Sequence, residues 1–268
     1  MPLRYRVVTR RRRLLSGWWC LLVCWFCPGQ VAADAPVVAV AANLRFAVTE
    51  IADAYERQGN DPVRLSFGSS GNIRRQISQG APFEIFVSAD DANALALHEQ
   101  GLAEDEGVVL ATGQLALYAA DRSPIVPDTG LAGLEGALEQ GLVRRFAIAN
   151  PEHAPFGQVA REVLVAQDLW DEIQPFLVVG ENAGQAAQFA ASGSVDGALI
   201  PYSLVVASGF GGSGRHAVVA SRLHAPLHQR MVLLSGAGEK AREFFAYLQS
   251  PQASVVMERH GFVPPHLD

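Results

Sequence analysis

Short apolar runs alternate with amphipathic segments along most of the chain, and this alternation restricts the fold more than any other feature. "VVAVAA" (37–42) predicts a buried strand, and residues 44–57 place apolar side chains at helical spacing. "VRLSFG" (63–68) and residues 72–79 repeat the strand and the helix. Strand and helix in this order predict right-handed βαβ units and a parallel sheet.

The pattern continues over the rest of the chain and divides it into two sets. After the strand 83–89, Asp90 is expected to cap a helix that runs to Gln100. The later strands are expected at 114–120, 144–150, 176–180, 197–201, 216–220 and 230–236. The later helices are expected at 157–167, 183–192, 239–248 and 251–260.

Two α/β lobes follow from this division. The chain is expected to cross between them near residues 111–114 and to return near 223–230. The predicted boundaries are 36–112 plus 229–268 for lobe I and 113–228 for lobe II.

The first 35 residues have the pattern of a secretory signal. Arginines at 4, 6 and 10–13 precede the apolar stretch 14–27, which is short for a membrane span of ~20 residues. Small residues then allow cleavage after Ala33 or Ala35, with an uncleaved anchor as the alternative. We therefore expect an exported, periplasmic protein.

Loss of this segment would change the chemistry of the chain. It holds all three cysteines (Cys20, Cys24 and Cys27), so the mature chain is expected to have no disulfide and no thiolate. It also holds six arginines and one aspartate, so its removal shifts the net charge from −6 to −11. An acidic body argues against nucleic acid or an anionic membrane as partner.

Four strand-to-helix junctions are short and rich in hydrogen-bond donors: "AANL" (41–44), "FGSSGN" (67–72), "NPEHAPFGQ" (150–158) and "GENAGQ" (180–185). Ligands of parallel α/β sheets gather where strands end and helices begin. The first N–H groups of a helix have no partner within it, and with the helix dipole they favour an anion. None of the four contains Lys or Arg. The alternative is that these residues are ordinary caps and turns.

Other candidate sites have less support. Arg74 and Arg75 lie about one turn into a helix, where a solvated face competes with phosphate binding. His216, His224 and His228 do not place three metal ligands on one face of one element, and no HExxH is present. No GxSxG, GxxxxGK[ST] or GxGxxG motif occurs. We therefore expect neither an enzyme nor a cofactor.

Several blocks of the sequence resemble the molybdate-binding proteins of bacterial ABC importers. They are "VVAVAANL", "LSFGSSGNIRRQISQGAPFEIFVSAD", "AIANPEHAPFGQVAREVL", "GENAGQAAQFAASGSVDGALIPYS" and "RHGF". The resemblance covers nearly all of residues 37–264. It implies a periplasmic-binding-protein fold of type II, in which each lobe is a mostly parallel sheet flanked by helices and an oxyanion binds in the cleft between the lobes.

The same resemblance implies a set of oxyanion-binding residues: Ala42, Asn43, Ser70, Phe156, Ala183 and Tyr202. Asn43 and Ser70 would donate from side chain and backbone, and Ala42, Phe156 and Ala183 from the backbone alone. Tyr202 lies near a position where some members use a tyrosine hydroxyl. Many members have Ser at the position of Asn43 and a small or tyrosyl residue at that of Phe156, so Phe156 would serve through its backbone and as a lid.

The implied function is to bind molybdate, and tungstate with it, for a membrane permease with a cytoplasmic ATPase. The protein would be a monomer without protein ligands to the metal itself. Near neutral pH these anions carry no proton whereas phosphate does, so a pocket of donors alone penalises phosphate. This logic requires Glu152 and Glu181 to point outward.

Three alternatives remain open from the sequence. Sulfate is also a bare dianion, so cavity size would have to exclude it, and a receptor for sulfate or another oxyanion is one alternative. A receptor for a chelated metal is another. The third is an exported hydrolase that uses Ser69 or Ser70 with a histidine.

Overall fold

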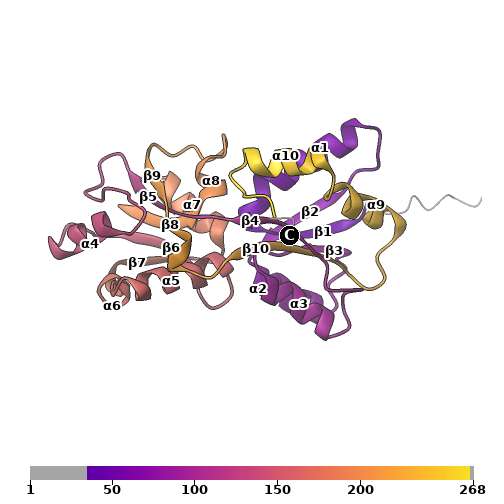
Figure 1. The fold of residues 1–268 in the computed structure, drawn as a ribbon, viewed down its shortest axis with the longest axis horizontal. Coiled ribbons are helices and arrows are strands. Elements are labelled where there is room, and N and C mark those ends of the chain that lie inside the picture. The colour runs from indigo at the N-terminus through magenta and orange to yellow at the C-terminus, as the bar shows by residue number, and fades with distance from the viewer. Residues whose placement is uncertain (1–34, 266–268) are drawn as a thin grey trace, which may run out of the picture. The chain divides into compact units, whose positions relative to one another are not determined.

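The computed structural model describes residues 35–265, so the predicted signal and its cysteines lie outside the described residues. Two five-stranded sheets, each flanked by helices, account for the described part (Figure 1). We call the first sheet with its helices lobe I and the second with its helices lobe II. The predicted two-lobe α/β fold class is confirmed. Among the described residues, no helix is both long and apolar enough to cross a membrane.

The sheet of lobe I has the strand order β2-β1-β3-β10-β4. Its strands are β1 (Val37–Ala41), β2 (Arg64–Gly68), β3 (Ile85–Val87), β4 (Val108–Gly113) and β10 (Leu227–Leu233). Its helices are η1 (Ala42–Leu44), α1 (Arg45–Arg57), α2 (Ser70–Ser78), α3 (Asp91–Glu99), α9 (Glu239–Tyr247) and α10 (Pro251–Arg259). Strand β1 is parallel to β2 and β3, whereas β10 is antiparallel to β3 and β4.

The sheet of lobe II repeats this topology in the order β7-β6-β8-β5-β9. Its strands are β5 (Leu115–Ala120), β6 (Phe146–Ala149), β7 (Leu177–Gly180), β8 (Gly197–Pro201) and β9 (Gly214–Val218). Its helices are α4 (Ala132–Glu139), α5 (Pro155–Ala166), α6 (Trp170–Ile173), η2 (Gln174–Phe176), α7 (Ala183–Ala191), α8 (Tyr202–Val205) and η3 (Ser221–Leu223). Four strands run in one direction and only β5 is reversed, as only β10 is in lobe I, so each sheet is mixed but mostly parallel, as predicted.

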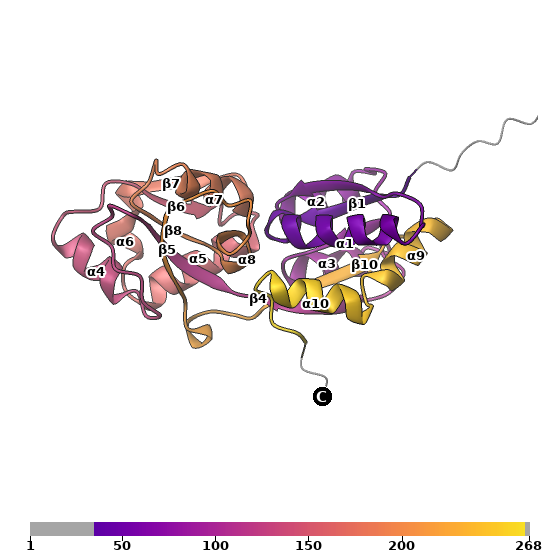
Figure 2. The same cartoon turned by 90° about the horizontal axis from the view of Figure 1, so that it is seen from above.

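Two segments carry the chain between the lobes. Gln114 alone separates β4 from β5, and residues 219–226 connect β9 to β10. Figure 2 shows β4 extending from lobe I toward lobe II. Both connections fall where the sequence predicted crossings, although the lobe boundaries themselves stay a prediction.

Apolar burial explains why the central strands read as unbroken hydrophobic runs. Val38 and Val40 of β1 are fully buried, as are Phe146 and Ile148 of β6. Parallel strands at the centre of such sheets are covered by helices on both faces, so both faces of each strand must be apolar. Burial of each large side chain contributes about 1.5–3 kcal/mol.

Asp91, the first residue of α3, joins this helix to the crossing strand β10. Its carboxylate accepts a hydrogen bond from Arg230 Nε at 2.6 Å and lies 2.6 Å from His228 Nδ1. Burial raises the pKa of Asp91, but the hydrogen bonds and positive charges of Arg230 and His228 together lower it by more. The pKa of Asp91 therefore lies below its ordinary value.

We expect Asp91→Asn to destabilise the protein by about 1 kcal/mol near pH 7, because the carboxylate is partly exposed and screened. The depressed folded-state pKa gives stability that is complete above the unfolded pKa of about 3.9 and is lost as the pH falls through the folded pKa. Urea unfolding at several pH values should therefore show the two proteins converging below about pH 4. A constant difference down to pH 2 would contradict this.

Candidate functional site

The four donor-rich junctions meet around one cavity. They follow β1 and β2 in lobe I and β6 and β7 in lobe II, which occupy equivalent places in the two sheets. The cavity is small, with a volume of about 10 Å³. Its lining residues are Ala41, Ala42, Asn43, Gly68, Ser69, Ser70, Ala89, Ala154, Pro155, Phe156 and Ala183. No ionisable side chain is among these residues, so any charge on a ligand must be met by dipoles.

Five of the six predicted site residues line this cavity: Ala42, Asn43, Ser70, Phe156 and Ala183. Tyr202 is not among the lining residues. Its ring lies 5.7 Å from that of His216, and its N–H donates to the carbonyl of Gln114. The next residue, Ser203, contacts a lining residue instead, because its hydroxyl donates to the Asn43 carbonyl at 2.9 Å. The binding roles of the six residues stay a prediction.

Asn43 is held from both lobes. It is buried in η1, and its Nδ2 donates to Oε1 of Gln229 at 2.7 Å. Its carbonyl accepts from Ser203 of lobe II. A side-chain amide nitrogen has two N–H donors, so Asn43 keeps one more for a ligand.

The two serines of "FGSSGN" differ in their hydrogen bonds. The Ser70 hydroxyl oxygen accepts from the Ala89 N–H at 3.0 Å, so its own hydrogen remains for donation. Ser69 is 4% exposed, and its hydroxyl has no hydrogen-bond partner among the described residues. Buried polar groups without partners are rare in folded proteins. The Ser69 hydroxyl is therefore a donor that a ligand in this cavity would satisfy.

Ser69 also tests the interpretation of the junctions as ordinary caps. It is the N-cap residue of α2, yet its side chain makes no capping bond. Asn182, the N-cap of α7, does cap, because its side chain accepts from the Gln185 N–H at 3.1 Å. Capping therefore explains the side chain at the fourth junction but not the serine at the second. The sequence predicted that this helix begins at Asn72, whereas α2 begins at Ser70. For this reason the sequence did not identify Ser69 as the N-cap position.

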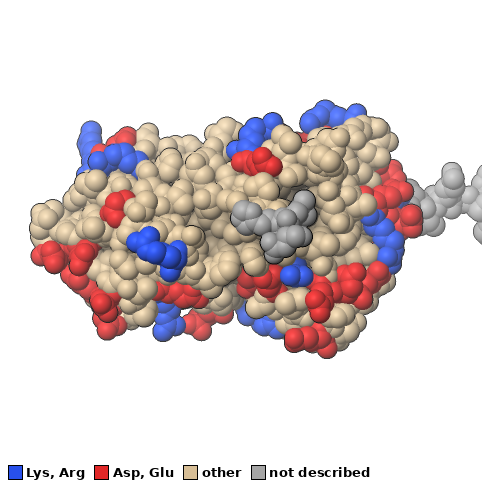
Figure 3. Space-filling model, in the orientation of Figure 1, with Lys and Arg blue, Asp and Glu red and all other residues tan. Residues whose placement is uncertain are grey.

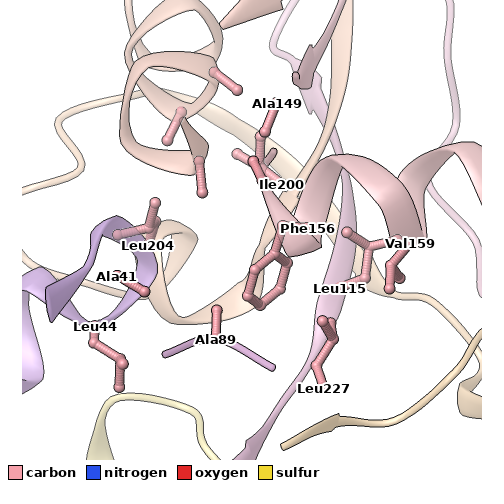
Figure 4. Close-up of a cluster of buried hydrophobic side chains, with 14 of the residues drawn as sticks. Ala41, Leu44, Ala89, Leu115, Ala149, Phe156, Val159, Ile200, Leu204 and Leu227 are labelled. Carbon is pink, nitrogen blue, oxygen red and sulfur yellow. The ribbon is translucent and has the colours of Figure 1, made fainter. Parts of the chain in front are cut away.

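The Phe156 side chain packs toward the crossing strands. Figure 4 shows its ring directed toward Ala89 and Leu227. A Cβ on Gly113 of β4 would lie 3.1 Å from the ring carbon Cζ. The apolar ring offers no donor, so Phe156 can serve a ligand only through its N–H in the first turn of α5.

Charged groups near the junctions lie outside the lining of the cavity. The Glu181 side chain is 57% exposed, accepts from Asn72 and lies 3.1 Å from His153 Nε2. Glu152 is exposed and lines a separate surface groove. Arg74 donates to Asn93 of the neighbouring helix. On the face drawn in Figure 3, basic side chains are interspersed with acidic ones.

The structure gives no support to a metal site or a catalytic serine in the described region. Residues 35–265 contain no cluster of three or more His, Cys, Asp or Glu side chains that could hold a metal ion. His216 packs on Tyr202, and His228 binds Asp91. Neither Ser69 nor Ser70 is hydrogen-bonded to a histidine.

One close backbone contact joins the lobes beside the cavity. The Gly71 N–H in α2 donates to the His153 carbonyl at 2.9 Å, and a Cβ at position 71 would lie 2.7 Å from that oxygen. Asn72 donates to Glu181 next to it. Only a residue without a side chain permits this approach.

Comparisons with known proteins agree with this architecture. The sequence matches the family described as "Bacterial extracellular solute-binding protein" over residues 36–263. It is 32% identical to the molybdate-binding protein ModA of Rhodobacter capsulatus over 87% of this chain and 89% of that protein. It is 33% identical to ModA of Azotobacter vinelandii over 84% and 88%, respectively. The structure of the periplasmic molybdate-binding protein of A. vinelandii superposes with a TM-score of 0.78 at 28% identity, covering 86% of this chain and 99% of that one.

We expect Gly71→Ala to weaken binding of the predicted oxyanion about tenfold, because the added methyl group separates α2 from His153. Stability should change by less than about 1 kcal/mol, since alanine favours the helix. Gly136→Ala is the matched control, because it lies in α4 with its nearest neighbour 4.0 Å away. Titration calorimetry and thermal unfolding of both variants measure the two effects. Unchanged affinity in Gly71→Ala would contradict the prediction.

Proposed function

Because the chain belongs to the bacterial extracellular solute-binding proteins, we propose that it binds molybdate, and tungstate by the same chemistry, for import into the cell. The proposed site is the cavity at the four junctions, with Ala42, Asn43, Ser69, Ser70, Phe156 and Ala183 as donors. The family comprises solute-binding proteins rather than enzymes, and neither Ser69 nor Ser70 is hydrogen-bonded to a histidine.

The unpartnered hydroxyl of Ser69 is the observation that supports this proposal most directly. A buried hydroxyl without an acceptor costs about 1–3 kcal/mol, which a ligand oxygen would offset. The cavity around it contains helix starts from both lobes and no cationic side chain. An anion that presents only acceptor oxygens suits such a site without charge pairing.

The same cavity lining favours molybdate over phosphate as the ligand. Phosphate near neutral pH carries a proton, and no carboxylate lines the cavity to accept it. An unpaired O–H would weaken phosphate binding by about 1–3 kcal/mol. Sulfate carries no proton, so it would be rejected by size, because Mo–O and W–O bonds are longer than S–O bonds and bring the anion's oxygens closer to the donors.

Closure of the lobes would couple binding to transport. The ligand would stabilise the closed arrangement because only there do donors from both lobes reach it. We propose that the closed form, acting as a monomer outside the cytoplasm, delivers the anion to a membrane permease driven by a cytoplasmic ATPase.

Calorimetric titration of the chain from residue 36 with molybdate, tungstate, sulfate and phosphate at pH 7 tests the proposal. We expect one-to-one binding of molybdate and tungstate at least about 100-fold tighter than that of the other two, which corresponds to ~2.7 kcal/mol. If the protein prefers sulfate, the proposed binding site stands and sulfate replaces molybdate as its ligand. Failure of all four anions to bind would overturn the function.

Substitution of the two serines separates a ligand donor from a structural group. Ser69→Ala should weaken molybdate binding about tenfold without destabilising the free protein, because its hydroxyl has no partner there. Ser70→Ala should weaken binding and also lower the free energy of unfolding by about 1–3 kcal/mol, because the Ala89 N–H loses its acceptor.

Ser78→Ala serves as the control for both, since Ser78 lies at the far end of α2 and bonds Gln100. Urea unfolding and titration calorimetry give the two readouts. Unchanged molybdate affinity in Ser69→Ala would show that its hydroxyl is not a ligand donor.

A further inference from the structure

Gln229 is a fully buried amide at a position where the strand pattern calls for an apolar residue. Along β10, Leu227, Gln229 and Met231 are buried, whereas His228 and Arg230 between them are partly exposed. Alternation of this kind places the buried side chains on the core face. A polar group there is tolerated only when its hydrogen bonds are made.

The hydrogen bonds of Gln229 allow only one orientation of the side-chain amide of Asn43, which it contacts. Its Nε2 donates to the carbonyls of Leu227 at 2.8 Å and Ala89 at 3.3 Å. Both of its N–H donors are thereby used, and Oε1 is left to accept. Asn43 must then present Nδ2 rather than Oδ1 to Gln229, at 2.7 Å.

The same bonds connect the two predicted side-chain donors of lobe I. Gln229 binds the Ala89 carbonyl, and the Ala89 N–H binds Ser70 Oγ at 3.0 Å. Asn43, Gln229, Ala89 and Ser70 thus form one continuous chain of hydrogen bonds beneath the cavity. A donation from Ala89 to Ser70 Oγ directs the hydroxyl hydrogen of Ser70 elsewhere, toward a ligand.

The Gln229 carboxamide also lies at the crossing between the lobes. A Cβ on Gly113 would come within 2.8 Å of its Nε2 and 3.1 Å of the Phe156 ring. Gly113 thus leaves space that Gln229 and Phe156 share. The amide therefore contacts the crossing strand β4 and the donor Asn43 at the same time.

We propose that Gln229 is a positioning residue for the oxyanion site, which fixes the donor orientation of Asn43 and, through Ala89, that of Ser70. This inference rests on the molybdate-binding function proposed above. Gln229 itself is not among the residues that line the cavity. Its effect on binding must therefore pass through Asn43 and Ser70.

A double-mutant cycle in molybdate binding tests the proposal. Gln229→Met keeps the length of the side chain and removes its hydrogen bonds, so we expect about tenfold weaker binding. In an Asn43→Ala background the same substitution should weaken binding by less than about threefold, because the oriented donor is already absent. An equal loss in both backgrounds, or no loss in either, would overturn the proposal.

Two controls separate positioning from a general loss of stability. Met231→Ala removes a buried side chain from the same strand outside the chain of hydrogen bonds, so it should destabilise the protein without changing molybdate affinity more than about twofold. If Gln229→Met does not fold, Gln229→Glu decides the question. It keeps an acceptor for Asn43 but not the donors to Ala89 and Leu227, so the link to Ser70 is lost and binding should weaken by more than about threefold.

Wild-type affinity in Gln229→Glu would overturn the inference. The wild-type titration distinguishes this outcome from failure of the function itself. If the wild type does not bind molybdate, the proposed function has failed. If the wild type binds and the Gln229 variants bind equally well, only the positioning role has failed.

Discussion

The N–H donors at the start of a helix have no partner within the helix and need acceptors elsewhere. The placement of the four strand-to-helix junctions around one cavity follows from that requirement. Each sheet delivers two helix starts at the ends of equivalent strands, β1 and β2 in one lobe and β6 and β7 in the other. Because the two lobes have the same topology, all four starts can face one point when the lobes approach. The result is a cavity rich in donors that contains no formal charge in its lining.

Two direct hydrogen bonds join the lobes without any ligand. Ser203 binds the Asn43 carbonyl, and the Gly71 N–H binds the His153 carbonyl. These bonds hold the described lobes together independently of any anion. Apparent affinity is the intrinsic affinity of the closed form scaled by its population, so a change at either contact alters binding without touching a ligand donor.

The sequence predicts the strands and junctions well because their signals are local. Apolar runs and helical spacing located most elements, and the predicted cap is confirmed, since Asp90 accepts from the Asn93 N–H. The sequence did not reveal β4, whose partners β10 and Val263 are distant in the sequence, nor α4, which follows a loop with two prolines. Strand β10 begins three residues earlier than predicted because its first residues pair with β4.

Site details escaped prediction where they depend on distant partners. The lack of a capping bond at Ser69 can be seen only once the start of α2 is fixed. The bond between Asn43 and Gln229 joins residues 186 positions apart. Tyr202 and Ser203 are adjacent in a short helix, whose geometry directs them to different surroundings, and no periodic signal tells which one reaches Asn43.

A lining without ionisable groups has a consequence for where such a receptor can work. A protein outside the cytoplasm meets whatever acidity the surroundings impose, because the cell does not buffer that space. A site built on histidines would gain or lose positive charge as the pH of the surroundings changes. Backbone amides and hydroxyls do not titrate in that pH range. The affinity for the anion would therefore change with pH only through protonation of the anion itself.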